Sequence, residues 1–172
     1  TNETFWFRDM YPFEAMKKLI LPELSQRGVS RVRIWSAACS TGQEPYSIAM
    51  VAHEYMSSKQ NTSKLDVQIT GTDISSSVLA VARQGIYDYG AITRGLPIDK
   101  RNHHFIGIGN TWQIKDDIRR MVNVKEFNLM NDYQSLGKFH IIFCRNVMIY
   151  FSSEMKKMML SKISNMLEPK GY

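Results

Sequence analysis

The sequence has little cysteine and no long hydrophobic run, and each absence excludes a class of protein. Its 172 residues contain two cysteines, Cys39 and Cys144. Two are too few for a disulfide framework, so we expect reduced thiols packed as small apolar groups. No apolar run reaches about 18 residues, so no membrane-spanning helix is expected. The N-terminal residues lack the pattern of a signal peptide, and we expect a cytoplasmic protein without direct membrane insertion.

Glycine is scarce at the place where a dinucleotide site would need it. An apolar strand predicted over residues 32–37 leads into a turn with a single glycine, Gly42, in place of a G-x-G-x-x-G pattern. A helix is predicted over residues 44–58, with Pro45 suited to its first turn. Glu44 at the start of this helix disfavours a phosphate and favours a cationic or hydroxyl-bearing ligand. S-adenosylmethionine has an ammonium group, a sulfonium and a ribose diol but no phosphate, so the turn favours that cofactor.

Histidine and clustered positive charge are also limited. Of four histidines, His103 and His104 have no partners at the spacing of metal ligands, so we expect no metal site. The net charge of +6 suggests an acidic partner. Lysine and arginine nevertheless occur as dispersed short pairs, which are typical of a solvated surface. We therefore expect no nucleic-acid partner.

Strand and helix patterns alternate along most of the chain, which predicts one α/β domain over residues 1–172 with a doubly wound parallel sheet. Strands are predicted over residues 32–37, 65–72, 122–127 and 139–144. The last of these is a continuous apolar run, typical of a buried parallel strand. Residues 170–172 resemble the turn into a further strand, so we expect the last strands of the sheet to be missing.

The alternation breaks over residues 86–124, where we predict a small inserted antiparallel β-subdomain. Residues 105–115 have the pattern of a β-hairpin with a Gly/Asn turn. No helical pattern follows Gly107 and Gly109, so these glycines form a turn and not a phosphate-binding loop. The opening residues 1–12 are rich in aromatic side chains and are predicted to form a lid segment, in which Arg8 needs a polar partner.

Polar residues follow the predicted strands at the edge where open α/β sheets bind ligands. These residues are Glu44, Asp73, Asn128, Arg145 and Asn146. An acid that ends the second strand commonly accepts hydrogen bonds from ribose hydroxyls, although Asp73 is also suited to cap the following helix. Polar strand ends that recur in chain order indicate a binding site.

Residues 35–49 (WSAACSTGQEPYSIA) resemble the cofactor motif of the CheR family of chemotaxis receptor methyltransferases. Residues 72–75 (TDIS) and 143–151 (FCRNVMIYF) match later motifs of the family in order. Residues 2–8 (NETFWFR) are similar to its N-x-T-x-F-F-R segment, with Trp6 in place of a phenylalanine. The resemblance covers essentially the whole chain. It implies a Rossmann-like methyltransferase that transfers the methyl group of S-adenosylmethionine to glutamate side chains on chemoreceptor cytoplasmic helices, leaving S-adenosylhomocysteine.

The resemblance also assigns residues to the site. It implies that the cofactor pocket is lined by Asn2, Thr4, Arg8, Glu44, Asp73, Asn128, Leu129, Arg145 and Asn146. Glu44 is expected to face the methionine ammonium group, and Asp73 the ribose hydroxyls. Arg8 and Tyr150 are expected to be the catalytic residues, because they would lie nearest the methyl acceptor. A glutamate acceptor is already ionised at pH 7, so no general base is required.

The chain departs from the family in two places. Family members usually carry an amino-terminal helical domain implicated in receptor recognition, which we expect to be absent from this protein. Some members have an extended glycine-containing hairpin loop that binds a pentapeptide of the receptor, whereas residues 107–112 are short. We therefore expect a protein that does not depend on this tether. The expected partners are methyl-accepting chemoreceptors, and the expected state is a monomer.

Other functions stay open from the residues alone. A nucleic-acid amino-methyltransferase would share the fold and cofactor, but an Asn/Asp-Pro-Pro-Tyr segment is expected where this chain has residues 144–147 (CRNV). A methyltransferase acting on a small molecule is a second alternative. A nucleotide-dependent oxidoreductase lacks the glycine fingerprint. A domain that binds the cofactor or the receptor without transferring methyl groups is the remaining alternative.

Overall fold

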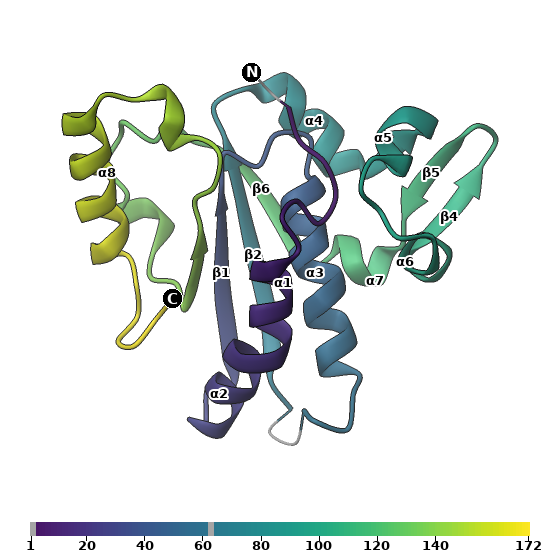
Figure 1. Cartoon of the computed structure of the whole chain (residues 1–172), viewed down its shortest axis with the longest axis horizontal. Helices are drawn as coiled ribbons and strands as arrows, with labels where there is room; N and C mark the ends of the chain where they lie inside the picture. The colour runs from purple at the N-terminus through teal and green to yellow at the C-terminus, as the bar shows by residue number, and fades with distance from the viewer. Residues whose placement is uncertain (1–2, 62–63) are drawn as a thin grey trace.

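The computed structural model of the protein describes residues 3–61 and 64–172, and its centre is a four-stranded parallel sheet (Figure 1). The strands are β1 (Arg31–Ala37), β2 (Asp66–Asp73), β6 (Val122–Glu126) and β7 (Ile141–Phe143), in the order β6-β2-β1-β7. Each neighbouring pair is parallel. The predicted α/β sheet is therefore confirmed.

Helices cover both faces of this sheet, as a doubly wound fold requires. On one face, Ile34 of β1 packs in a large core with helix α3 (Gln43–Met56). On the other face, Trp35 packs in a second core with Met159 of helix α8 (Ser153–Asn165). Consecutive residues of β1 enter different cores because successive side chains of a strand point to opposite faces.

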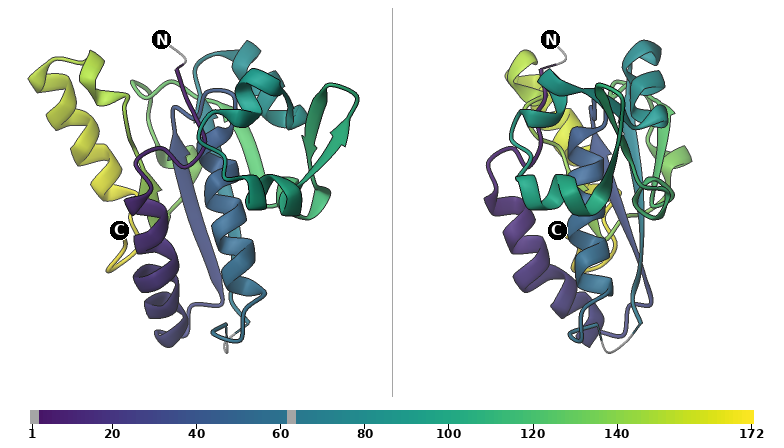
Figure 2. Two further views of the ribbon diagram at one scale, coloured as in Figure 1. Left: turned by 45° about the vertical axis from the view of Figure 1, so that its right-hand side comes forward. Right: turned by 90° about the vertical axis from the view of Figure 1, so that its right-hand side faces the viewer.

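The N-terminal helical stretch runs alongside α3 (Figure 2). It consists of α1 (Tyr11–Ala15), the π-helical η1 (Met16–Ile20) and α2 (Leu21–Gln26). The sequence predicts one helix that is kinked by Pro22 and ended by Gly28. Pro22 has no N–H for the carbonyl four residues earlier, and its ring crowds that carbonyl, so the wider π turns lie directly before it. Gly28 follows α2 with a φ of +76°.

A three-stranded antiparallel sheet forms a small lobe beside the main sheet, on the side opposite α8 (Figure 1). Its strands are β3 (Ile86–Asp88), β4 (Phe105–Ile108) and β5 (Thr111–Ile114), in the order β3-β5-β4. The short helices of this lobe are α5 (Tyr89–Thr93), α6 (Ile98–His104) and α7 (Asp116–Arg119). The inserted antiparallel sheet is thus confirmed. Helices as short as α5 and α6 show too little periodicity to be predicted. The stretch predicted as the insert overlaps β6, which belongs to the main sheet.

The last strand of the main sheet is shorter than the predicted residues 139–144. Phe139 forms a parallel bridge with Leu167 instead of joining β7. The backbone N–H of Tyr172 donates to the carbonyl of His140, and the backbone carbonyl of Tyr172 accepts from the N–H of Ile142, both at 2.9 Å. Residues after α8 therefore lie along the β7 edge of the main sheet. The remaining elements are helix α4 (Ser76–Gln84) and the 3-10 turns η2 (Gln134–Leu136) and η3 (Met148–Tyr150).

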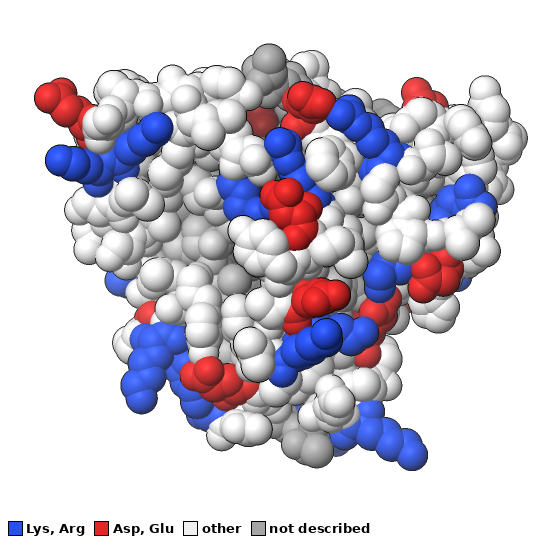
Figure 3. All heavy atoms as spheres, in the orientation of Figure 1, with Lys and Arg blue, Asp and Glu red and all other residues white. Residues whose placement is uncertain are grey.

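Charged side chains of both signs are mixed over the surface. On the face in Figure 3, lysine and arginine are interspersed with aspartate and glutamate and form no single basic patch. Several surface charges of the protein are paired, as in Lys18 with Glu14 at 3.6 Å. None of the helices in the described ranges combines the length and the apolar character needed to cross a bilayer.

Candidate functional site

A cavity opens at the carboxyl ends of β1, β2 and β7, where the sequence predicts a ligand site. Its walls come from the N-terminal segment, the turn after β1, the end of β2 and the segment after β7. The predicted site residues that line it are Thr4, Arg8, Glu44, Asp73, Arg145, Asn146 and Tyr150. The fold therefore brings together residues from both ends of the chain.

The other predicted site residues are not placed in this cavity. Asn128 and Leu129 follow β6 and are absent from the described lining. Oδ1 of Asn128 accepts a hydrogen bond from the N–H of Met130 at 2.9 Å, and Leu129 is buried in the core that contains Trp35. Asn2 lies outside the described residues. A cofactor role for these three stays a prediction.

The turn after β1 brings backbone close to the cavity. Ala38 and Ser40 have positive φ angles of 56° and 50°, and Gly42 has a φ of +98°. A Cβ atom on Gly42 would lie 3.0 Å from Cβ of Ala82 and 3.1 Å from the hydroxyl of Tyr87. Glycine suits both the backbone angle and the close packing. One glycine is therefore enough to make the turn, and α3 begins directly after it.

Asp73 joins the ends of β1 and β2. Its Oδ2 accepts a hydrogen bond from the N–H of Ser40 at 2.9 Å, and its Oδ1 accepts one from the N–H of Ser75 at 3.0 Å. The side chain is buried and still lines the cavity. Each carboxylate oxygen has a second lone pair, so Asp73 keeps acceptor capacity after these bonds. Asp73 thus organises both turns and has the acceptors that ribose hydroxyls need.

Glu44 enters the cavity from the first turn of α3. Its Oε1 accepts a hydrogen bond from the hydroxyl of Ser36 at 2.8 Å, and its Oε2 accepts one from Arg145 at 3.1 Å. Burial raises the pKa of Glu44 above its usual range, although the hydrogen bond from Ser36 and the charge of Arg145 each lower it. A mostly buried carboxylate at a cavity wall is a suitable partner for an ammonium group.

The guanidinium of Arg145 connects Glu44 to the N-terminal segment. Its Nη2 donates to the backbone carbonyl of Arg8 at 2.7 Å and to Oδ2 of Asp9 at 2.5 Å. The planar fork of arginine suits such simultaneous binding. Asp9 was not predicted as a site residue, because no sequence pattern links two residues that are 136 positions apart.

The N-terminal segment carries Arg8 to the cavity in a strained conformation. Phe7, Asp9 and Met10 have φ angles of 49°, 64° and 39°. Positive φ values cost about 1–3 kcal/mol each in residues other than glycine and persist where the surroundings over-determine them. The guanidinium of Arg8 lies 5.2 Å from the ring centroid of Phe5. The position of Arg8 therefore depends on contacts made by its neighbours.

Trp6 anchors the same segment to the small lobe. Its Nε1 donates to the carbonyl of Ala91 at 3.0 Å, and its ring makes edge contacts with Tyr87 and Phe105. Gly95 has a φ of +89°, and a Cβ atom there would lie 2.4 Å from the carbonyl oxygen of Trp6. The segment predicted as a lid therefore packs between the cavity and the inserted lobe.

Asn146 and Tyr150 form the wall after β7. Asn146 has a φ of 58°, an angle that asparagine adopts more readily than most residues. Tyr150 lies in η3 and is 61% exposed. An exposed phenol at the edge of the cavity is accessible to a substrate that approaches from solvent.

The two cysteines are free thiols, with Cys39 in the cavity wall. Burial raises the pKa of Cys39 to about 12 and the pKa of Cys144 to about 11. Both thiols are protonated at neutral pH, so neither is suited to act as a nucleophile. Across residues 3–61 and 64–172, no group of three His, Cys, Asp or Glu side chains is placed to hold a metal ion.

Solved structures of methyltransferases share the fold. PKMT2 from Rickettsia typhi superposes with a TM-score of 0.55 at 20% identity, covering 98% of this chain and 25% of that one. The glycopeptide N-methyltransferase MtfA complexed with S-adenosylmethionine superposes with a TM-score of 0.51 at 11% identity, covering 90% of this chain and 51% of that one. At these identities the likeness shows a Rossmann-like methyltransferase fold.

Sequence relatives are much closer. The chain is 48% identical over its whole length to chemotaxis protein methyltransferase 1 of Pseudomonas aeruginosa and 47% identical to chemotaxis protein methyltransferase Cher2 of Pseudomonas putida. It spans 64% and 63% of the length of these two relatives. Residues 2–172 match the family described as CheR methyltransferase, SAM binding domain, where SAM is S-adenosylmethionine. The chain belongs to the CheR methyltransferase family and comprises its S-adenosylmethionine-binding domain.

Proposed function

We propose that the protein transfers the methyl group of S-adenosylmethionine to glutamate side chains on the cytoplasmic helices of chemoreceptors. The observation that carries the proposal is one cavity at the strand ends, lined by Glu44, Asp73 and Arg8, in a chain of the CheR methyltransferase family. The names of its relatives, chemotaxis protein methyltransferases, support the class of substrate.

The lining residues fit the proposed cofactor by charge and hydrogen bonding. Glu44 is the carboxylate for the methionine ammonium group, and Asp73 offers acceptors to the ribose hydroxyls. Arg145 donates a hydrogen bond to Glu44, so the carboxylate is already oriented when a ligand binds. When bound, S-adenosylmethionine supplies an electrophilic methyl group on a sulfonium. The protein's task is then to place an acceptor in line with that group.

Orientation matters more than activation for a glutamate acceptor. A glutamate with a pKa near 4.3 is ionised at pH 7 without a general base. Holding two reacting groups in line can lower a barrier by roughly 7–11 kcal/mol. The negative charge of the acceptor is lost during transfer, so complete pairing of both oxygens would stabilise the ground state too much. Arg8 binds one oxygen and leaves the other to attack, and the phenol of Tyr150 orients the acceptor.

The same proposal covers the receptor tether, the oligomeric state and the cellular compartment of the protein. The turn between β4 and β5 is tight, and the hydroxyl of Thr111 donates back to the carbonyl of Ile108 at 2.9 Å. This short hairpin supports methylation that is independent of a receptor pentapeptide tether. We further propose a monomer that acts in the cytoplasm.

A methyl-transfer assay separates this function from its alternatives. The purified chain is incubated with methyl-labelled S-adenosylmethionine and with receptor cytoplasmic fragments, tRNA or DNA in parallel. We expect label on the receptor fragment alone, released by mild base because a glutamate methyl ester is base-labile. Label on nucleic acid would contradict the substrate class. Binding of S-adenosylhomocysteine without transfer to receptor fragments would indicate a domain that only binds the cofactor.

A further inference from the structure

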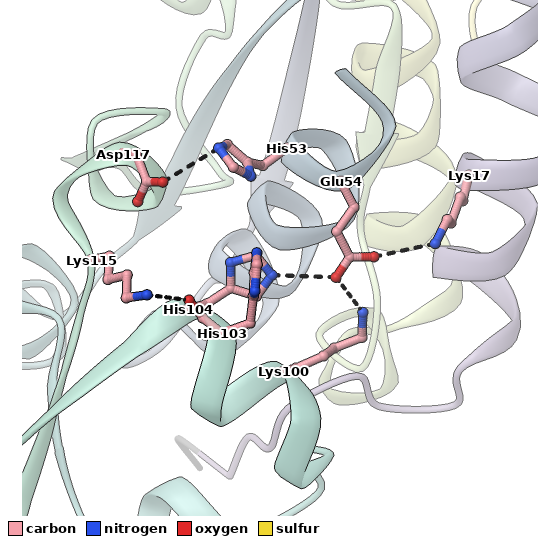
Figure 4. Close-up of polar contacts among 8 residues, drawn as sticks. All are labelled: Lys17, His53, Glu54, Lys100, His103, His104, Lys115 and Asp117. Atoms are coloured by element: carbon pink, nitrogen blue, oxygen red, sulfur yellow. Dashed lines mark hydrogen bonds and ion pairs between the residues drawn. The ribbon is translucent and has the colours of Figure 1, made fainter. Parts of the chain in front are cut away.

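A charged cluster lies where the N-terminal helical stretch, α3 and the small lobe meet (Figure 4). Glu54, in the last turn of α3, accepts hydrogen bonds from Lys100 at 2.7 Å on Oε1 and from Lys17 at 3.2 Å on Oε2. The buried His104 lies 3.3 Å from Oε1 through its Nε2. Lys17 belongs to η1, whereas Lys100 and His104 belong to α6. One carboxylate thus ties together three elements that are far apart in the sequence.

Glu54 stays charged in this environment. The hydrogen bond to His104, followed by those to Lys100 and Lys17, holds the pKa of Glu54 well below its usual range. Its side chain is 25% exposed and that of Lys100 is 17% exposed. A charge-assisted hydrogen bond of this kind is stronger and shorter than a neutral one, so the Lys100 side chain is held in place.

Lys100 connects the cluster to the segment that carries Arg8. Its Nζ lies 5.3 Å from the ring centroid of Phe7, the residue directly before Arg8. Phe7 is buried, and its N–H donates to the hydroxyl of Ser47 at 3.1 Å. Its ring also packs edge-on against Phe13, which lines the cavity. A displacement of Phe7 would therefore move the adjoining backbone at the cavity wall.

Two contacts hold the strained segment at neighbouring residues. Arg145 binds the carbonyl of Arg8, and Lys100 lies over the ring of Phe7. We infer that Glu54 is a positioning residue for Arg8, because it holds Lys100 against Phe7 and so maintains the left-handed backbone that leads into Arg8. The inference rests on the proposed function for what Arg8 does in methyl transfer, and on the contacts alone for how Arg8 is placed.

Glu54→Gln tests the inference, because it keeps the size of the side chain and removes the charge. We expect kcat for receptor methylation to fall about tenfold, while KM for S-adenosylmethionine changes by less than about twofold, since a small misplacement of a reacting group lowers the rate more than ligand binding. Glu54→Asp, which keeps the charge, should restore part of kcat. The matched control is Glu14→Gln, at an exposed helix residue paired with Lys18 at 3.6 Å, and its kcat should match that of the wild type.

Backbone hydrogen exchange over residues 5–10, measured with S-adenosylhomocysteine present, reads the position of the segment without any assay of turnover. We expect faster exchange in Glu54→Gln than in Glu14→Gln. That result supports the inference even if the wild type methylates no receptor. Absence of methylation by the wild type would reject the proposed function and leave the inference about the position of Arg8 standing. Unchanged exchange contradicts the inference, as does unchanged kcat in a chain whose wild type is active. A parallel loss of cofactor binding contradicts it too, since the effect of Glu54 would then reach the cofactor site and not Arg8 alone. If Glu54→Gln does not fold, Lys100→Gln gives the same comparison.

Discussion

Arg145 donates a hydrogen bond from Nη2 to the backbone carbonyl of Arg8 at 2.7 Å. The two residues are 137 positions apart, and the bond joins the segment after β7 to the N-terminal segment. The same guanidinium binds Glu44 at 3.1 Å. One side chain therefore holds the residue proposed to contact the methyl acceptor in a fixed relation to the residue proposed to contact the cofactor.

Replacing Arg8 by alanine should lower turnover far more than cofactor affinity. The guanidinium would orient the acceptor, so we expect kcat to fall by about 10- to 100-fold, while the Kd for S-adenosylhomocysteine stays within about threefold. Initial rates and calorimetric titration measure the two effects. Arg94→Ala is the control, because Arg94 also lies over the ring of Phe5, at 5.5 Å. Equal losses of turnover and affinity in Arg8→Ala would make Arg8 a cofactor clamp.

Replacing Arg145 by lysine should weaken both cofactor binding and turnover, each by about tenfold. Lysine keeps the charge but is a compact ammonium without the planar fork that reaches Glu44, Asp9 and the Arg8 carbonyl together. Titration with S-adenosylhomocysteine and initial rates test this. Arg31→Lys, at an exposed arginine 3.6 Å from Asp66, should leave both quantities unchanged. A fall in turnover without a loss of cofactor affinity would show that Arg145 does not act on the cofactor through Glu44.

Binding of S-adenosylhomocysteine should weaken as the pH falls through a range above the ordinary titration of a glutamate. Burial raises the pKa of Glu44, so this carboxylate takes up a proton at a higher pH than a solvated glutamate does. Protonation removes the charge that attracts the ligand's ammonium group. Titrations between about pH 5 and pH 8 should show this loss in the wild type and a flatter, weaker profile in Glu44→Gln. A wild-type profile as flat as that of the variant would exclude Glu44 as the partner of the ammonium group.

Glu54 should contribute to folding stability at neutral pH and lose that contribution in acid. Its pKa is lowered in the folded state by His104 and the two lysines. A group with a lowered folded pKa stabilises the fold above its unfolded pKa, about 4.3 for glutamate, and loses this effect as the pH falls further. We expect Glu54→Gln to lower the free energy of unfolding by about 1–3 kcal/mol at pH 7. Urea unfolding should show this difference shrinking below about pH 4. If the difference in unfolding free energy between the wild type and Glu54→Gln grew as the pH fell, it would contradict a lowered pKa for Glu54 in the folded state.

The parts of the fold that the sequence predicts are those encoded in adjacent residues. An apolar strand, a turn with Gly42 and a helix with Pro45 in its first turn are all local features, and the structure has each of them. The position of Asp73 at the end of β2 likewise follows from the residues directly before it. The antiparallel hairpin follows from its turn residues. These features need no knowledge of what packs against them.

The contacts between distant residues were not predictable. No sequence pattern pairs Arg145 with Asp9 or places Lys100 over Phe7, because each contact depends on how the N-terminal segment crosses the sheet edge. The positive φ angles at Phe7 and Met10 are equally hidden, since these residue types ordinarily avoid them. These backbone angles can be recognised only in the structure, together with the residues that contact the segment.

A crystal structure of the chain with S-adenosylhomocysteine tests the central claim most directly. The proposal predicts the ligand in the cavity at the carboxyl ends of β1, β2 and β7, with its amino group within hydrogen-bonding distance of Glu44 and its ribose hydroxyls on Asp73. A ligand bound elsewhere, or a cavity that stays closed at saturating ligand, would contradict it.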